Sequence, residues 1–147
     1  MNTKTIFIHF GNTKFNKERF VIPKNRNFGN KPIGGLWASP ENADFGWKEW
    51  NDVEHYVECD PDNAFRFKLK KGTRLYEIHS KKDADMLPVV ENNMALLCLG
   101  IGMDTYDWEA IAKECDAVMY YEHSKCMYGW ECDSILVLNP DVIIPLK

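Results

Sequence analysis

The spacing of apolar and polar residues along the chain predicts short strands separated by turns. Residues 5–10 form a β-branched and aromatic run, which is typical of a first strand. Residues 64–70 alternate apolar and basic side chains, and a second apolar run follows at 74–78. Because only Lys71, Gly72 and Thr73 separate these two runs, we predict two strands joined by a tight turn.

Two other segments carry their apolar residues at helical spacing. In residues 45–57, tryptophan and valine recur every three or four positions between charged residues, which predicts an amphipathic helix. Residues 108–115 repeat this pattern, and Asp107 is suited to the start of that helix.

The rest of the chain adds strands and loops. Residues 11–34 are rich in Asn, Lys, Gly and Pro and predict a long irregular loop, whereas 83–97 predict mixed helix and loop. The order of elements predicts an α+β fold with predominantly antiparallel sheets. Further predicted elements are strands at 36–39, 117–121 and 134–138, a turn at 128–130, and an extension of a sheet edge at 142–145.

Length and composition indicate one ordinary globular domain covering residues 1–147. The chain has 147 residues, of which 45% are hydrophobic and 27% charged, so neither a disordered nor a fibrous class is favoured. The longest uncharged run, residues 92–103, is too short to span a bilayer, and the polar N-terminus lacks a signal-peptide core. We therefore expect a cytoplasmic protein without a membrane partner. A monomer is compatible with the sequence, which leaves the oligomeric state open.

The cysteines and histidines do not form a recognisable metal or disulfide pattern. Five cysteines are an odd number with no close pair, and the four histidines lie in different segments. We predict reduced thiols and no metal.

The charge is unevenly distributed. The net charge is −4, but residues 11–33 hold six basic residues against one glutamate, so this segment is +5 and the remainder −9. The segment is either a solvated loop or an electrostatic patch for phosphate-bearing ligands and targets.

The first strand ends in His9, Phe10 and Gly11. This element resembles the first strand of the ADP-ribosyltransferase superfamily, in its diphtheria-toxin and poly(ADP-ribose) polymerase branch. The resemblance implies a split pair of small antiparallel sheets with flanking short helices, and NAD lying across the gap. It places these three residues against the cofactor: His9 would bind the adenosine-side ribose, and the backbone near Gly11 the nicotinamide amide. A glycine there suits the close approach of a planar ligand.

The second element is a glycine-led strand that ends in Trp37, Ala38 and Ser39, with Trp47 ten residues after the first tryptophan. It is similar to the strand of the same branch in which two aromatic residues sandwich the nicotinamide ring. Trp37 and Trp47 would take these roles and Ser39 would join the cofactor site. Aromatic faces suit a flat, initially cationic leaving group.

The third element begins at Glu131 and Asp133 and continues into a hydrophobic run that closes at Asn139 and Pro140. It looks like the late strand of the superfamily, which an acidic residue immediately precedes. The resemblance makes Asp133 the catalytic acid, with aspartate in place of the usual glutamate, and Glu131 the second choice. A carboxylate there would stabilise the positive charge that develops on the ribose as nicotinamide leaves.

Taken together, the three elements predict an NAD-dependent mono-ADP-ribosyltransferase of the kind found among bacterial and phage effectors. Its acceptor would be a macromolecule, either protein or nucleic acid. Two other functions stay open: an NAD glycohydrolase that uses water as the acceptor, and a catalytically silent module that binds ADP-ribose, a nucleotide or a partner protein. A nucleic-acid-binding domain built on residues 11–33 is a third possibility.

Each site residue also has a purely structural interpretation. His9 fits an ordinary strand histidine, and tryptophans at helical spacing are often core residues. Asp133 fits a turn carboxylate at the entry of a strand, and the Ser39 hydroxyl fits a cap for the following segment. Cys132, beside the proposed acid, has no evident histidine partner and is poor evidence for a thiol nucleophile.

Overall fold

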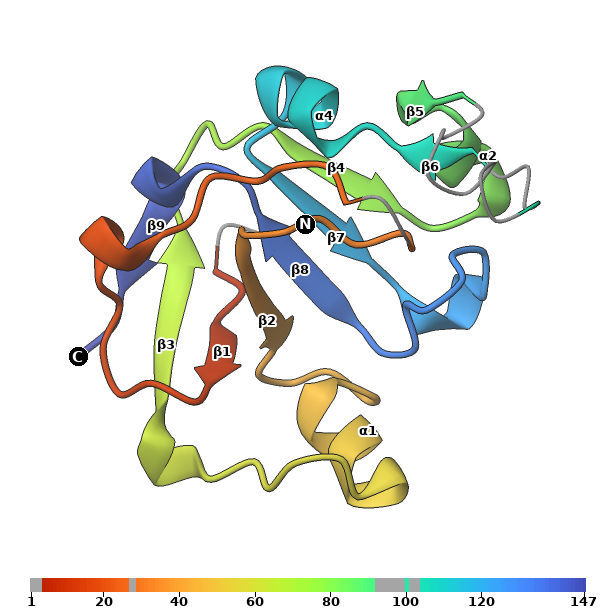
Figure 1. Cartoon of the computed structure of the whole chain (residues 1–147). Coiled ribbons are helices and arrows are strands. Elements are labelled where there is room, and N and C mark those ends of the chain that lie inside the picture. The colour runs from red at the N-terminus through yellow and green to blue at the C-terminus, as the bar shows by residue number, and fades with distance from the viewer. Residues whose placement is uncertain (1–3, 27–28, 92–99, 101–103) are drawn as a thin grey trace.

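The computed structural model of the chain describes residues 4–26, 29–91, 100 and 104–147, and Figure 1 shows short helices around a seven-stranded sheet. The strand order in this sheet is β4-β7-β8-β2-β1-β3-β9. All neighbouring strands pair antiparallel except β4 and β7, which are parallel. The prediction of an α+β fold with mostly antiparallel pairing is confirmed. The strands are β1 (Phe7–Phe10), β2 (Leu36–Pro40), β3 (Ala64–Leu69), β4 (Leu75–Ile78), β7 (Ala117–Tyr120), β8 (Ser134–Val137) and β9 (Ile143–Pro145).

The helices and the remaining strands are short. Strands β5 (Val89–Val90) and β6 (Thr105–Tyr106) form a separate antiparallel pair. The helices are α1 (Trp47–Glu54), α2 (Lys81–Asp85) and α4 (Trp108–Glu114). The Asp107 side chain accepts a hydrogen bond from the backbone N–H of Ala110, as its predicted place at the start of that helix requires. Single 3-10 turns lie at Lys17–Arg19, Pro61–Asn63, Glu122–Ser124 and Pro140–Val142.

The sheet is narrowest at the junction of β1 and β2. These strands pair only through Phe7 with Pro40 and Ile8 with Ser39, whereas every other ladder of this sheet has three or four pairs. The narrow junction divides the sheet into β4-β7-β8-β2 on one side and β1-β3-β9 on the other. It is also the place where the candidate site opens.

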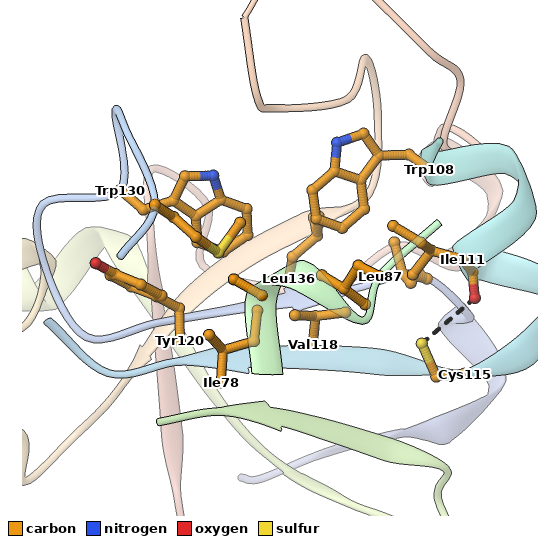
Figure 2. Close-up of a cluster of buried hydrophobic side chains, with 12 residues drawn as sticks. Ile78, Leu87, Trp108, Ile111, Cys115, Val118, Tyr120, Trp130 and Leu136 are labelled. Atoms are coloured by element: carbon orange, nitrogen blue, oxygen red, sulfur yellow. Dashed lines mark hydrogen bonds between the residues drawn. The ribbon is translucent and has the colours of Figure 1, made fainter. Parts of the chain in front are cut away.

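Two hydrophobic clusters cover opposite faces of the sheet, because successive side chains of a strand point to opposite sides. In β8, Ile135 and Val137 belong to one cluster with Phe7 and Phe67. Leu136 lies between them in sequence and joins the other cluster, where α4 packs on the sheet (Figure 2). Burial on both faces explains why β8 is apolar from Ile135 to Val137.

The turn between β3 and β4 forms as predicted, but the two strands do not pair with each other. Gly72 takes a φ of +85° in that turn, which favours glycine. Strand β3 pairs with β1 and β9, whereas β4 pairs with β7 at the other end of the sheet. Alternating polarity identifies strands but does not identify their partners.

The predicted irregular loop, residues 11–34, is fastened to α4 at its far end. Asn25 donates from its side-chain amide to the carboxylate of Asp107 at 2.9 Å. The carbonyl of Asn30 accepts the indole N–H of Trp108 at 3.1 Å. Gly34 then brings the chain to β2 with a φ of +84°, and a Cβ there would lie 2.6 Å from the carbonyl oxygen of Val21. These contacts fix where the basic residues of the loop lie.

The part of the predicted 83–97 segment that the structure describes contains the end of α2 and strand β5, and residues 92–97 lie outside the described residues. In the described part of the chain, no helix combines the length and the apolar character needed to cross a membrane.

Candidate functional site

A cavity of about 490 Å³ opens beside the junction of β1 and β2. Its walls come from the end of β1, from β2, from α1 and from the segment that precedes β8. The cavity therefore draws together the three sequence elements that were expected to form one site. The wall residues include His9, Phe10, Lys31, Trp37, Ser39, Trp47, Trp50, Tyr56, Trp130 and Glu131.

Where the β1–β2 ladder ends, the side chain of His9 in β1 forms a hydrogen bond to the backbone of β2. Its Nδ1 lies 2.6 Å from the carbonyl oxygen of Trp37, so Nδ1 carries the proton and donates. The ring packs on Phe65 at 5.0 Å between centroids. Burial lowers the pKa of His9, so the imidazole is neutral at neutral pH. Nε2 is then an acceptor, and its neighbour is the side-chain amide of Asn12 at 3.4 Å.

The two predicted aromatic residues both line the cavity, and each also packs against another tryptophan. Trp37 meets Trp130 edge-on, with ring centroids 4.7 Å apart. Trp47 stacks on Trp50 at 5.1 Å, with Tyr56 placed edge-on to both. The core interpretation and the site interpretation of these tryptophans are thus compatible, since one face can pack while another remains on the cavity wall.

Ser39 has a structural role. The residue is buried, and its hydroxyl donates to the carbonyl oxygen of Asp133 at 2.7 Å while accepting the backbone N–H of Trp47 at 2.8 Å. A strand side chain thus satisfies the first N–H of α1 and joins it to the segment before β8. Gly46 precedes the helix, and its N–H donates to the carboxylate of Glu49.

Replacing Ser39 should therefore loosen the site as a whole. Ser39→Ala leaves the partly buried N–H of Trp47 and carbonyl of Asp133 without this partner, so we expect a loss of about 2 kcal/mol in the free energy of unfolding. Urea denaturation measures it. Thr13→Ala removes a hydroxyl from an exposed position and is the matched control. Equal midpoints for Ser39→Ala and the wild type would remove Ser39 from this role.

The structure places Glu131, and not Asp133, on the cavity wall. The Glu131 carboxylate accepts the indole N–H of Trp50 at 3.1 Å. The Asp133 carboxylate is engaged elsewhere, since it accepts the backbone N–H of Glu122 at 2.8 Å. Burial raises the pKa of Asp133. Of the two predicted acids, the second choice is therefore the one that the fold brings to His9 and the tryptophans.

Phe10 and Gly11 differ in what they offer to a ligand. Phe10 lines the cavity. The N–H of Gly11 donates to the carbonyl oxygen of Asn63 at 2.8 Å, so it is already paired within the protein. Gly11 has a φ of +105°, a backbone conformation that favours glycine.

Four further residues line the cavity although no sequence pattern indicated them: Lys31, Trp50, Tyr56 and Trp130. Lys31 lies over Trp37 at 5.6 Å from the ring centroid and is the residue through which the basic loop reaches the cavity. Its position follows from the anchoring of Asn30, which no local sequence pattern reveals. Trp50 was expected on the apolar face of the helix, and that face is the one that meets the cavity.

The chemistry available at the site is that of an aromatic pocket with one carboxylate and one ammonium. Across the described ranges, no group of three or more histidine, cysteine, aspartate or glutamate side chains is arranged to hold a metal ion. Comparison of the chain with protein-family models, with curated proteins and with solved structures finds no match.

Proposed function

We propose that the protein is an NAD-dependent mono-ADP-ribosyltransferase in which Glu131 is the catalytic carboxylate. The observation that carries the proposal is the convergence of three segments, remote in sequence, on a single cavity. These segments bring His9 from the first strand, Trp37 from the second, and Glu131 from the approach to β8. The narrow β1–β2 junction and the mostly antiparallel sheet support an ADP-ribosyltransferase-like split fold.

The cavity suits the two ends of the dinucleotide differently. The indole rings of Trp37 and Trp47 offer apolar faces to the flat, cationic nicotinamide ring. The Nε2 of neutral His9 accepts from the Asn12 amide over a long 3.4 Å, and a ribose hydroxyl would take the place of this contact. Lys31 supplies positive charge for the pyrophosphate. NAD would be a co-substrate, and the proposal needs no metal.

Cleavage of the bond between nicotinamide and ribose moves the bonding electron pair onto nicotinamide, which leaves as a neutral ring. Positive charge grows on the ribose C1′ and O4′, and a fixed carboxylate close by stabilises it. Trp50 holds the Glu131 carboxylate through its indole N–H, so the charge is oriented before the reaction. A macromolecular nucleophile then takes the ADP-ribose.

The direct test is to incubate the purified protein with NAD labelled on the adenylate and with cell lysate. We expect label to enter protein or nucleic acid, and free nicotinamide to appear with it. Nicotinamide release that is equally fast without lysate would identify an NAD glycohydrolase instead. If neither label transfer nor nicotinamide release occurs, the enzymatic proposal fails.

A silent binding module is the second candidate, because the N–H of Gly11 and the carboxylate of Asp133 are both paired within the protein. Calorimetry separates the two: a silent module binds NAD or ADP-ribose without releasing nicotinamide.

Lys31→Gln tests the proposed pyrophosphate contact. Removing one ammonium from the cavity wall should weaken NAD binding by about fivefold, and the remaining binding should depend less on salt. Calorimetric titration at two salt concentrations measures both effects. Lys24→Gln removes a charge from an exposed position on the same loop and should leave the affinity unchanged. If Lys31→Gln binds NAD as tightly as Lys24→Gln and the wild type do, the pyrophosphate does not lie at Lys31.

A further inference from the structure

Six of the ten large hydrophobic side chains that are exposed in the described part of the chain gather on two surfaces. Single exposed apolar residues are ordinary, whereas groups of them mark places where another molecule binds. The first group, the loop surface, consists of Val21, Ile22 and Ile33. The second group, the helix surface, consists of Val53, Tyr56 and Val57. The exposed fractions of these side chains lie between 47% and 70%, so neither surface covers the other within one chain.

The loop surface is held in shape by backbone hydrogen bonds. The N–H groups of Lys24 and Ile33 each donate to the carbonyl oxygen of the other residue at 2.9 Å. The N–H of Gly35 donates to the carbonyl oxygen of Val21 at 2.8 Å. These bonds keep residues 21–24 beside residues 33–35, so the three aliphatic side chains and the Lys24 ammonium belong to one fixed unit.

The helix surface is formed by the end of α1 and the turn that follows it. The side-chain oxygen of the buried Asn51 accepts the N–H of Val57 at 3.0 Å, and its amide donates to the carbonyl oxygen of Trp47 at 2.7 Å. The Tyr56 ring lies edge-on to Trp47 and Trp50. Because these contacts already fix the turn, little conformational entropy is lost when a partner docks on it.

The two surfaces carry opposite charge. Residues 11–33 are +5, and residues 48–62 hold six carboxylates against one lysine, which makes them −5. No ion pair within the described residues engages four of these charged side chains, namely Arg19, Lys24, Glu54 and Glu58. Their charges are therefore available to another molecule, and complementary potentials steer two such surfaces together.

We propose that the helix surface of one copy of the protein docks on the loop surface of a second copy. Apolar side chains then meet apolar side chains, and the carboxylates around the helix surface meet the cations of the loop. The two surfaces flank opposite ends of β2, since the loop precedes this strand and α1 follows it (Figure 1). A docked pair thus keeps one loop surface and one helix surface free, so association is head-to-tail and continues into longer chains or a closed ring. Self-association of this kind does not depend on the proposed enzymatic activity.

Sedimentation velocity of the purified protein tests the docking. The average mass should rise above that of a single chain as the protein concentration is raised from about 1 μM to about 1 mM. An increase in ionic strength from about 0.01 M to about 1 M shortens the Debye length from about 30 Å to about 3 Å, and should weaken the association by about tenfold. A protein that stays a single chain throughout, or an association that salt does not weaken, would overturn the proposal; in the first case the two surfaces serve a different molecule.

Two variants at exposed positions separate head-to-tail docking from other kinds of association. Ile22→Asp places a carboxylate opposite the acidic helix surface, and Val53→Asn removes an apolar contact from α1. Each variant alone should self-associate at least about tenfold more weakly than the wild type. Met86→Asn replaces an exposed side chain outside both surfaces and is the matched control. Circular dichroism checks that each variant is folded.

An equal mixture of the two folded variants tests the polarity of the interface. Ile22→Asp keeps an intact helix surface and Val53→Asn keeps an intact loop surface. We therefore expect the mixture to form a heterodimer at wild-type strength that does not grow further. A mixture that stays monomeric, a mixture that grows like the wild type, or a loss of association in only one of the two variants would refute head-to-tail docking.

Discussion

Glu131→Gln should lower the rate of nicotinamide release from NAD by at least about a hundredfold, the loss typical of removing one preorganised electrostatic group. The substitution keeps the size of the side chain and an oxygen that can accept from Trp50, but it removes the negative charge. A structural role alone would therefore survive it. Single-turnover release of nicotinamide at saturating NAD measures the effect on the chemical step.

Asp133→Asn is the matched control. Asparagine keeps the acceptor oxygen that the N–H of Glu122 requires, and the carboxylate it replaces is not on the cavity wall. We expect release to stay within about threefold of the wild type, below the effect of a lost catalytic group. A collapse of activity in Asp133→Asn, with Glu131→Gln still active, would restore Asp133 as the catalytic acid and refute the assignment made from the structure.

The sequence predicted the residues of the first two strands and of α1 that line the cavity better than it predicted which carboxylate lines it. His9, Trp37 and Trp47 could be predicted because each lies in a regular element, where the motif position and the element coincide. Glu131 and Asp133 lie two residues apart and would share a face only in an extended strand. Strand β8 begins at Ser134, and the chain bends at Cys132, so the two carboxylates separate. Which of the two carboxylates faces the cavity depends on that bend.

The fold shows the same division between local and long-range information. Strand and helix positions follow from local periodicity, and most lie close to the predicted ranges. Strand pairing does not follow from local periodicity, since β4 pairs with β7 and not with its sequence neighbour β3. The Ser39 bridge is also long-range, because one hydroxyl links residues eight and ninety-four positions away. The cavity therefore depends on contacts that no single segment encodes.

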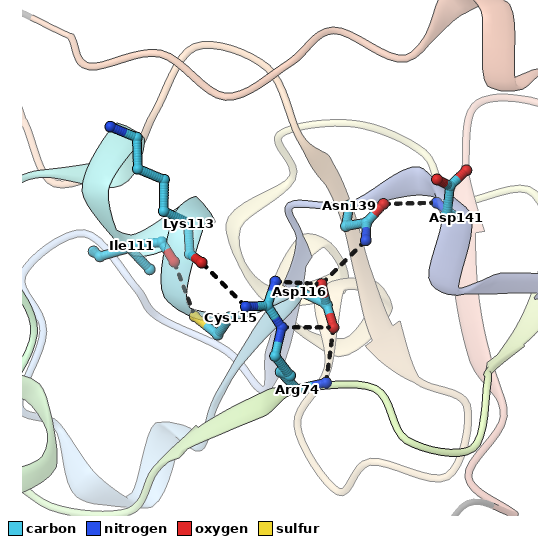
Figure 3. A network of polar contacts seen from close by, with 7 residues as sticks. All are labelled: Arg74, Ile111, Lys113, Cys115, Asp116, Asn139 and Asp141. Atoms are coloured by element: carbon cyan, nitrogen blue, oxygen red, sulfur yellow. Dashed lines mark hydrogen bonds and ion pairs between the residues drawn. The ribbon is translucent and has the colours of Figure 1, made fainter.

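A polar cluster centred on Asp116 links the segments next to β4, β7 and β8 (Figure 3). The buried Asp116 carboxylate accepts from the backbone N–H and the guanidinium of Arg74 and from the side-chain amide of Asn139. Its own carbonyl accepts the N–H groups of Leu138 and Asn139. One residue thus joins the chain just before β4 and β7 to the chain just after β8.

Asp116→Ala should lower the free energy of unfolding by about 3 kcal/mol, because it leaves several donors around a buried position without their acceptor. Urea denaturation at pH 7 measures the loss. Asp141→Ala is the control, since Asp141 pairs with Lys17 at the exposed surface and such pairs contribute little. Equal midpoints for Asp116→Ala and the wild type would mean that this cluster does not stabilise the sheet.

The same cluster predicts how stability changes in acid. Hydrogen bonds from Arg74 lower the pKa of Asp116 to about 2, below the value of about 3.9 expected in an unfolded chain. The unfolded state therefore takes up the proton first as the pH falls, so this contribution is complete above pH 4 and is lost between about pH 4 and pH 2. Asp116→Asn has no carboxylate to protonate, and the difference in stability between it and the wild type should shrink over that interval. If the difference stays constant down to pH 2, the Asp116 carboxylate is not held in its charged form by Arg74, and the contacts drawn in Figure 3 do not account for the stability of the sheet.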